Sequence, residues 1–131
     1  MSLTTLLLLY LAFRFKQLAC DFLLQTGWMA YGKGLPGREG YRALFSHTVI
    51  HAVGTLAIAL VFAPAFWWLA LVDFTVHSVV DRVKAVLTRT KKWDVKDAPF
   101  WWAFGIDQEI HNLTHVGYIV LMYMASVAAT V

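Results

Sequence analysis

The sequence predicts an all-α fold, an integral membrane four-helix bundle, and three observations lead to this prediction. The chain has 131 residues, of which 60% are hydrophobic and only 15% are charged, whereas about a quarter of the residues of a soluble domain are charged. Its mean hydropathy is +0.61. Ionisable residues inside the apolar stretches recur at every fourth position, which places them on one face of a helix. The length is that of a single domain, covering residues 1–131.

The apolar stretches define four expected membrane spans. The first stretch is strongly apolar at its start, but Arg14, Lys16 and Asp21 interrupt it and must face protein, because lipid does not solvate them. A loop rich in Gly and Pro follows it, a tight turn at Pro64 separates the second and third spans, and a basic loop precedes the fourth. We expect these spans at about residues 3–31, 43–62, 66–87 and 102–128.

The positive charges predict how the spans are oriented. All Lys and Arg residues except Arg14 and Lys16 lie in or beside the loops that follow the first and third spans. The positive-inside rule places these loops in the cytoplasm and both termini outside it. We therefore expect a protein of the bacterial inner (cytoplasmic) membrane that contacts lipid and forms a homo-oligomer or joins a larger membrane complex. Because the positive charges are gathered in these loops, we interpret the basic pI of 9.2 as a topology signal and do not expect nucleic acid as a partner.

The most informative stretch runs from Asp73 to Lys84. In it Asp73, His77 and Asp81 follow one another at intervals of four residues and climb one helix face. Two further segments repeat this pattern, and they contain all the other histidines: His47 with His51, and Asp107 with His111 and His115.

The predicted topology brings these residues to one depth. All of them, and Asp21, fall at the cytoplasmic end of the bundle, about 5–15 Å below the interface. Matching the helices turn by turn gives a shallow layer of His47, Asp81 and Asp107. A layer about 5.4 Å deeper contains Asp21, His51, His77 and His111, and Asp73 and His115 lie deeper again.

A cluster of histidines and carboxylates suits Zn²⁺, or Fe²⁺ or Mn²⁺, and this set is large enough for two ions. The lone Cys20 excludes a thiolate site. We expect His77 to be the central ligand, because only a cation would relieve the repulsion between the carboxylates above and below it. The alternative is a hydrogen-bonded network without metal, in which Asp21 pairs with Arg14 or Lys16. The expected ligands are His47, His51, His77, Asp81, Asp107, His111 and Asp21.

Four motifs together resemble a family of small bacterial and phage membrane proteins, the domain of unknown function family 3307. They are the run from Asp21 to Thr26, His47-x3-His51, Asp73-x3-His77-x3-Asp81-x2-Lys84, and Asp107-Gln108-x2-His111. The resemblance covers nearly the whole chain and implies no activity. The His-x3-His and His-x3-Asp pieces are also similar to membrane-bound metal-dependent hydrolases of the YdjM type, by analogy alone.

The first functional hypothesis is a metal-dependent hydrolase that acts at the cytoplasmic leaflet on a lipid or lipid-linked substrate. Metal-bound water would be the nucleophile, with Asp73 or Glu109 as general base. Two alternatives stay open. One is a metal or proton transport or binding module, or a small subunit of a membrane complex; the other is b-type haem binding between His51 and His111. The sequence contains no Walker loop, nucleophile elbow or dinucleotide fingerprint.

Overall fold

The computed structural model of the protein describes residues 1–128, and every regular element in that range is a helix. The predicted all-α class is therefore confirmed, while the last three residues of the expected domain lie outside the described range. The elements in chain order are α1 (Leu3–Leu18), the π-helical turn η1 (Ala19–Leu23), α2 (Gly27–Gly32), α3 (Gly37–Phe62), the 3-10 turn η2 (Pro64–Phe66), α4 (Leu69–Thr90) and α5 (Ala98–Ala128).

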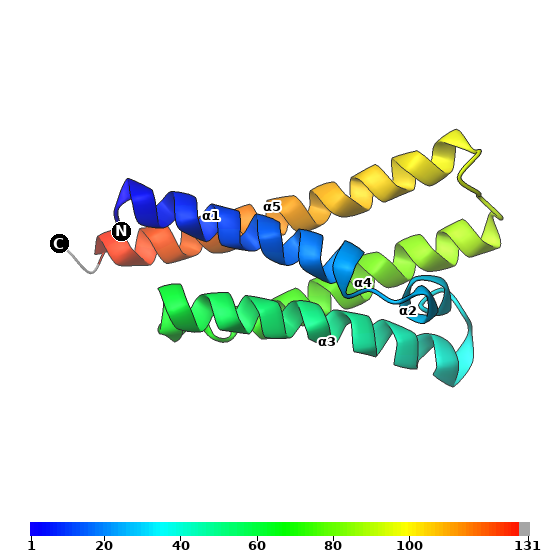
Figure 1. The fold of residues 1–131 in the computed structure, drawn as a ribbon, viewed down its shortest axis with the longest axis horizontal. Coiled ribbons are helices and arrows are strands. Elements are labelled where there is room, and N and C mark those ends of the chain that lie inside the picture. The colour runs from blue at the N-terminus through cyan, green and yellow to red at the C-terminus, as the bar shows by residue number, and fades with distance from the viewer. Residues whose placement is uncertain (129–131) are drawn as a thin grey trace.

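The four long helices α1, α3, α4 and α5 run along the length of the molecule (Figure 1). Helix α3 packs along α4, α4 against α5, and α1 against both α3 and α5. The start of α1, the end of α5 and the turn η2 lie at one end, which we call the terminal end, and there the Met1 amino group donates to Ser126 Oγ at 3.1 Å. The other end, which we call the loop end, holds α2 and the connection formed by residues 91–97 (Figure 1).

The prediction of one helix over residues 3–31 is wrong. Helix α1 stops at Leu18, the π turn η1 follows it, and α2 begins only at Gly27. Local hydrogen bonds explain the break, because the Gln25 side chain donates to the Asp21 carbonyl at 3.0 Å. The Thr26 hydroxyl then caps α2 by accepting the Met29 N–H at 3.3 Å. Asp21 thus lies in an irregular turn and not in a continuous span.

The other predicted spans correspond to helices that extend further toward the loop end. Helix α3 begins at Gly37 and not at residue 43, α4 continues to Thr90, and α5 begins at Ala98 and not at residue 102. The extra turns carry the basic residues that we assigned to loops, among them Arg38 and Arg89. Lys and Arg favour helices, so their charge does not mark where a helix ends.

By length and composition, α3 is the one helix within residues 1–128 that could cross a membrane unaided. Of the four expected spans, only the second, which corresponds to α3, meets this criterion within the described residues.

The interior is more polar than the surface. Among the described residues, 14 buried side chains are polar or charged and only 11 are hydrophobic. The histidines and aspartates of α3, α4 and α5 occupy the buried stripe, at every fourth position. An apolar core lies toward the terminal end, where Leu9 and Phe13 of α1 meet Leu69 of α4 and Met122 of α5. The polar cluster fills the interior between this core and the loop end.

Candidate metal centre

The seven ligands expected from the sequence come from η1, α3, α4 and α5, and the structure brings them together in the interior. Together with Asp73, they form three groups, in each of which the ligand atoms all lie within 4.8 Å of one another. The groups are Asp21 with His47 and His51, Asp81 with Asp107 and His111, and His51 with Asp73 and His77.

The π turn presents Asp21 to helix α3. A π turn shifts the helical register, and such turns are common at functional sites. Asp21 Oδ1 accepts the His51 Nε2 proton at 3.1 Å and lies 3.3 Å from His47 Nε2. Its other oxygen accepts the side-chain amides of Gln17 at 2.7 Å and Gln108 at 2.6 Å. The carboxylate is therefore fixed in place on both sides.

Asp81 Oδ2 lies at the centre of the cluster. His47 Nε2 is 3.6 Å from it and His111 Nε2 is 3.7 Å from it, and Asp107 Oδ1 is 3.6 Å from the same nitrogen of His111. All four atoms are buried and make no hydrogen bond. Ligand atoms around a tetrahedral Zn²⁺ lie about 3.3–3.5 Å apart, given bonds of about 2.0–2.2 Å. The spacing within each neighbouring pair is therefore close to that of ligands in a metal coordination shell, and Asp81, Asp107 and His111 form one such group while His47 belongs to the group of Asp21 and His51.

Three lysines neutralise carboxylates of this cluster, each through the oxygen that faces away from its centre. Lys33 Nζ lies 2.6 Å from Asp81 Oδ1 and Lys84 Nζ lies 2.7 Å from Asp107 Oδ2. The third pair is Lys16 with Asp73, at 2.7 Å. We did not expect these lysine partners from the sequence. Since lysines already compensate Asp73 and Asp81, no metal ion is needed to relieve the repulsion between the carboxylates of α4.

The ring of His77 is stacked between two other imidazoles. Its centroid lies 3.9 Å from that of His51 and 3.9 Å from that of His111, with 2° between the planes of His77 and His111. The Nδ1–H of His77 donates to the Asp73 carbonyl at 3.0 Å, and its Nε2 has no partner. A neutral imidazole held in this way presents a free lone pair, as metal-binding histidines do. The same stack does not fit haem between His51 and His111, because His77 fills the plane that a porphyrin would need.

The sequence matches the family described as "Protein of unknown function (DUF3307)" over residues 5–131. The chain belongs to this family. The predicted resemblance is therefore confirmed, whereas the likeness to hydrolases of the YdjM type is not shown. No curated protein and no solved structure matches the chain.

Asp73 and His115 of this DUF3307 protein form a network in which every polar atom has a partner. Asp73 accepts from Lys16 at 2.7 Å, from Thr55 at 2.9 Å and from His115 Nε2 at 3.3 Å. Arg14 approaches the other ring nitrogen of His115 at 3.4 Å, and Phe13 stacks on the ring at 5.0 Å. The expected layers place Asp73 and His115 at the same depth, and in the structure the two residues form a hydrogen bond between α4 and α5.

The structure places neither expected general base where it could act as one. All the hydrogen bonds around Asp73 hold it as a buried, neutralised carboxylate. Glu109 is exposed on α5 and accepts the Asn112 side-chain amide at 3.3 Å, so it does not join the cluster. Spacing along the helix explains the second result, because Glu109 is two residues from both Asp107 and His111 and projects from another face.

Proposed function

We propose that this DUF3307 protein is embedded in a membrane by its four long helices. The support is its inverted burial: 36 large hydrophobic side chains of the described residues are exposed, and a water-soluble protein rarely exposes apolar patches of more than a few hundred Å². Trp67 and Trp68 lie at the terminal end and Trp101 and Trp102 near the loop end, as expected of aromatic side chains at two membrane interfaces.

Cell fractionation tests this proposal. We expect the protein to stay in the membrane fraction after washing at high salt and at alkaline pH, and to dissolve only in detergent. Release by either wash would overturn it.

Within this bundle, the function that the site supports best is binding of a divalent metal ion, Zn²⁺ or else Fe²⁺ or Mn²⁺. The observation that carries this proposal is the convergence of unpaired atoms on Asp81 Oδ2. Each buried polar atom without a partner costs about 1–3 kcal/mol, and a cation would satisfy several of them at once. The atoms that would hold it belong to Asp81, Asp107 and His111, while the group of Asp21, His47 and His51, beside the free nitrogen of His77, offers a place for a second ion.

The electrostatic balance leaves room for a cation. Of the four carboxylates in the interior, Asp73, Asp81 and Asp107 each pair with a lysine, and Asp21 is held by amides and histidines alone. With neutral histidines, the site therefore keeps an uncompensated negative charge at Asp21. A buried charge is costly unless it is paired or coordinates a metal.

Access is expected from the loop end only. The apolar core around Leu9, Phe13, Leu69 and Met122 separates the polar cluster from the terminal end. A pathway for ions across the whole molecule would need polar groups in that half, so the structure favours a bound metal over transport through a single copy.

Two histidines of α5 provide a matched test. His111 and His115 are one turn apart and equally buried, but both ring nitrogens of His111 lack partners, whereas those of His115 have them. We expect His111→Gln to weaken metal binding by about 10- to 100-fold and His115→Gln to retain it. The measurement is elemental analysis of each purified protein, followed by titration with Zn²⁺. Equal metal content in both variants, or none in the parent, would overturn the proposal.

Metal-dependent hydrolysis of a lipid or lipid-linked substrate at the cytoplasmic leaflet is a second candidate function. The observation that favours it is that Asp107 also lines a groove open to the surface between α4 and α5. A bound metal ion would supply an activated water molecule. We expect the metal-loaded protein to release fatty acid or headgroup from labelled vesicles. We expect His111→Gln to abolish this release. If the metal-loaded protein releases neither fatty acid nor headgroup, this candidate is excluded and metal binding remains the proposed function.

A further inference from the structure

The groove between α4 and α5 lies directly beside the candidate metal centre. Its volume is about 660 Å³, and its walls are apolar, with Val83 and Leu87 on α4 facing Trp102 and Ile106 on α5. The two helices diverge toward the loop end, where residues 91–97 connect them (Figure 1). Helix α1 packs on α5 but ends at Leu18, and η1 and α2 continue along α3. The groove therefore faces the surroundings of the bundle and not another helix.

Two charged residues line this groove, and both belong to the polar cluster. Lys84 Nζ and Asp107 Oδ2 form an ion pair at 2.7 Å, in which the Lys84 side chain is 20% exposed and the Asp107 side chain only 2% exposed. The second oxygen of Asp107 faces His111 at 3.6 Å. A molecule in the groove would therefore meet Lys84 on its polar side and be separated from the candidate metal ligands by a single carboxylate.

The segment at the mouth of the groove is basic on balance. Trp93 and Trp102 line the groove, Arg89, Lys91 and Lys92 shortly precede Trp93 in the chain, and Asp94 and Asp97 follow it; all five charged side chains are exposed. We propose that this groove binds one acyl chain of an anionic membrane phospholipid, with the phosphate beside these three cations. Apolar walls suit the chain, and clustered cations next to a membrane-embedded helix attract anionic headgroups by about 1 kcal/mol each.

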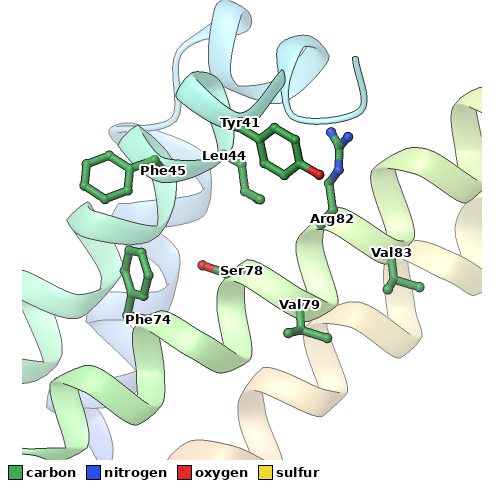
Figure 2. Close-up of a pocket in the computed structure, with 8 residues that line it drawn as sticks. All are labelled: Tyr41, Leu44, Phe45, Phe74, Ser78, Val79, Arg82 and Val83. Atoms are coloured by element: carbon green, nitrogen blue, oxygen red, sulfur yellow. The ribbon is translucent and has the colours of Figure 1, made fainter. Parts of the chain in front are cut away.

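The groove between α3 and α4 provides a contrast. It has a similar volume of about 550 Å³ and similar apolar walls, including Phe45 and Phe74 (Figure 2). Its cation is Arg82, which stacks on the Tyr41 ring at 4.8 Å and donates to the carbonyls of Lys33 and Leu35 at 2.6 and 2.8 Å. Arg82 and Lys84 are both engaged within the protein, so the exposed Arg89, Lys91 and Lys92 next to Trp93 in the chain are what favours the groove between α4 and α5 as the anionic lipid site.

This inference rests on the proposed membrane embedding, and it gives the second candidate function a substrate class. With the phosphate at the basic loop and the chain along Val83 and Val79, the ester linkage between them would lie next to Lys84. Lys84 is positioned to donate to an ester carbonyl, and Asp107 to contact the candidate metal ion at the same place.

Photolabelling in vesicles tests the inference. The purified protein is reconstituted with a phosphatidylglycerol that carries a diazirine on one acyl chain, and labelled peptides are mapped. We expect labels on the groove-lining residues of α4 and α5, several-fold more than with the matched phosphatidylcholine probe. Ala103→Phe, which fills this groove, should remove the labels, whereas Ser78→Phe, which fills the groove between α3 and α4, should leave them. The charge-removing pair Lys91→Gln and Lys92→Gln should lower the preference for phosphatidylglycerol without filling the groove.

The outcomes separate this inference from the proposed metal site. Zn²⁺ content is measured for every variant and should stay at the parental value, because none of these substitutions touches the expected ligands. Labels spread evenly over all exposed helix faces, or labels unchanged by Ala103→Phe, would mean bulk lipid contact only and would overturn the inference. If Ala103→Phe does not fold, an equal labelling of the parent by both lipid probes overturns it instead. Absence of groove labelling in a parent protein that holds Zn²⁺ contradicts the lipid site alone, whereas groove labelling of a parent protein without metal contradicts the metal site alone.

Discussion

Lysines and aspartates of the interior form ion pairs, and the pair of Lys16 with Asp73 is the most buried of these. Both side chains are less than 5% exposed and their charged atoms are 2.7 Å apart. Lys16→Met leaves the Asp73 carboxylate unpaired, so we expect the free energy of unfolding to fall by about 3–5 kcal/mol. The double variant Lys16→Met with Asp73→Asn removes both charges and should recover part of this loss. Denaturant unfolding in detergent micelles measures both, and equal losses in the two proteins would contradict the pairing.

His77 is the second residue for which the structure sharpens an expectation. Its Nδ1 is occupied by the Asp73 carbonyl and its Nε2 is free, while its ring touches those of His51 and His111. We predict that His77→Ala lowers metal affinity by about tenfold or more, with a milder effect for His115→Ala. Calorimetric titration with Zn²⁺ would measure both. Full binding by His77→Ala together with loss in His115→Ala would move the site toward Asp73.

The residue types of the cluster could be predicted from the sequence, but their partners could not. The interval of four residues identifies Asp73, His77 and Asp81 as one buried face, because helix geometry is local. Lys33 is 48 residues from Asp81, and Lys16 is 57 residues from Asp73. No pattern in the sequence links residues so distant, and the positive-inside rule led us to interpret Lys33 and Lys84 as topology signals only.

Among the helices, α1 departs most from its prediction. Apolar residues continue beyond Leu18, but the regular α-helical hydrogen bonding ends there. The apolar residues at positions 22–24 are expected to continue a helix, yet η1 follows Leu18 and the chain turns at Gln25 and Thr26. Hydrophobic patterning reports burial or lipid contact and carries no information on a single shifted hydrogen bond. The consequence is functional, since η1 is the element that aims Asp21 at His47 and His51.

The segment before α3 packs closely against Gly40, in the first turn of that helix. A Cβ on Gly40 would collide with the Leu35 carbonyl, and Leu35 and Lys33 are both bound by Arg82. We expect Gly40→Ala to lower the free energy of unfolding by about 1–3 kcal/mol and to loosen Lys33 from Asp81. The matched control is Gly105→Ala in α5, where a Cβ meets nothing within 4 Å and a gain of up to about 1 kcal/mol is expected. Thermal unfolding would compare them, and similar shifts for both would contradict the close packing.

The molecule as a whole follows the up-and-down order expected from the sequence. The start of α1, the end of α5 and η2 are at the terminal end, while α2 and the basic residues Arg89, Lys91 and Lys92 are at the loop end (Figure 1). The up-and-down order follows from the number of loops and turns between the apolar stretches, and these can be recognised in the sequence. The side on which each helix faces its neighbours depends on packing among distant segments, and there the lysine pairs and the stacked histidines could not be foreseen.

The last prediction concerns the orientation of the molecule in the membrane. The cations at the loop end, including Arg38, Arg89 and Lys92, are exposed, whereas η2 has no basic residue. Moving such a basic loop across the membrane is unfavourable, so we expect the loop end in the cytoplasm and both termini outside it. The buried Cys20 is the sole cysteine of the sequence and is protected, so single cysteines can be introduced at Ala65 in η2 and at Lys92.

A membrane-impermeant maleimide added to intact spheroplasts should label Ala65→Cys and spare Lys92→Cys, and lysis should expose Lys92→Cys. The reverse pattern would place the candidate metal centre toward the outer face, because its ligands lie nearer the loop end than the apolar core does. The metal and any lipid reaching the centre would then come from outside the cell membrane and not from the cytoplasmic leaflet. Orientation therefore decides which pool of ions and lipids the site can meet.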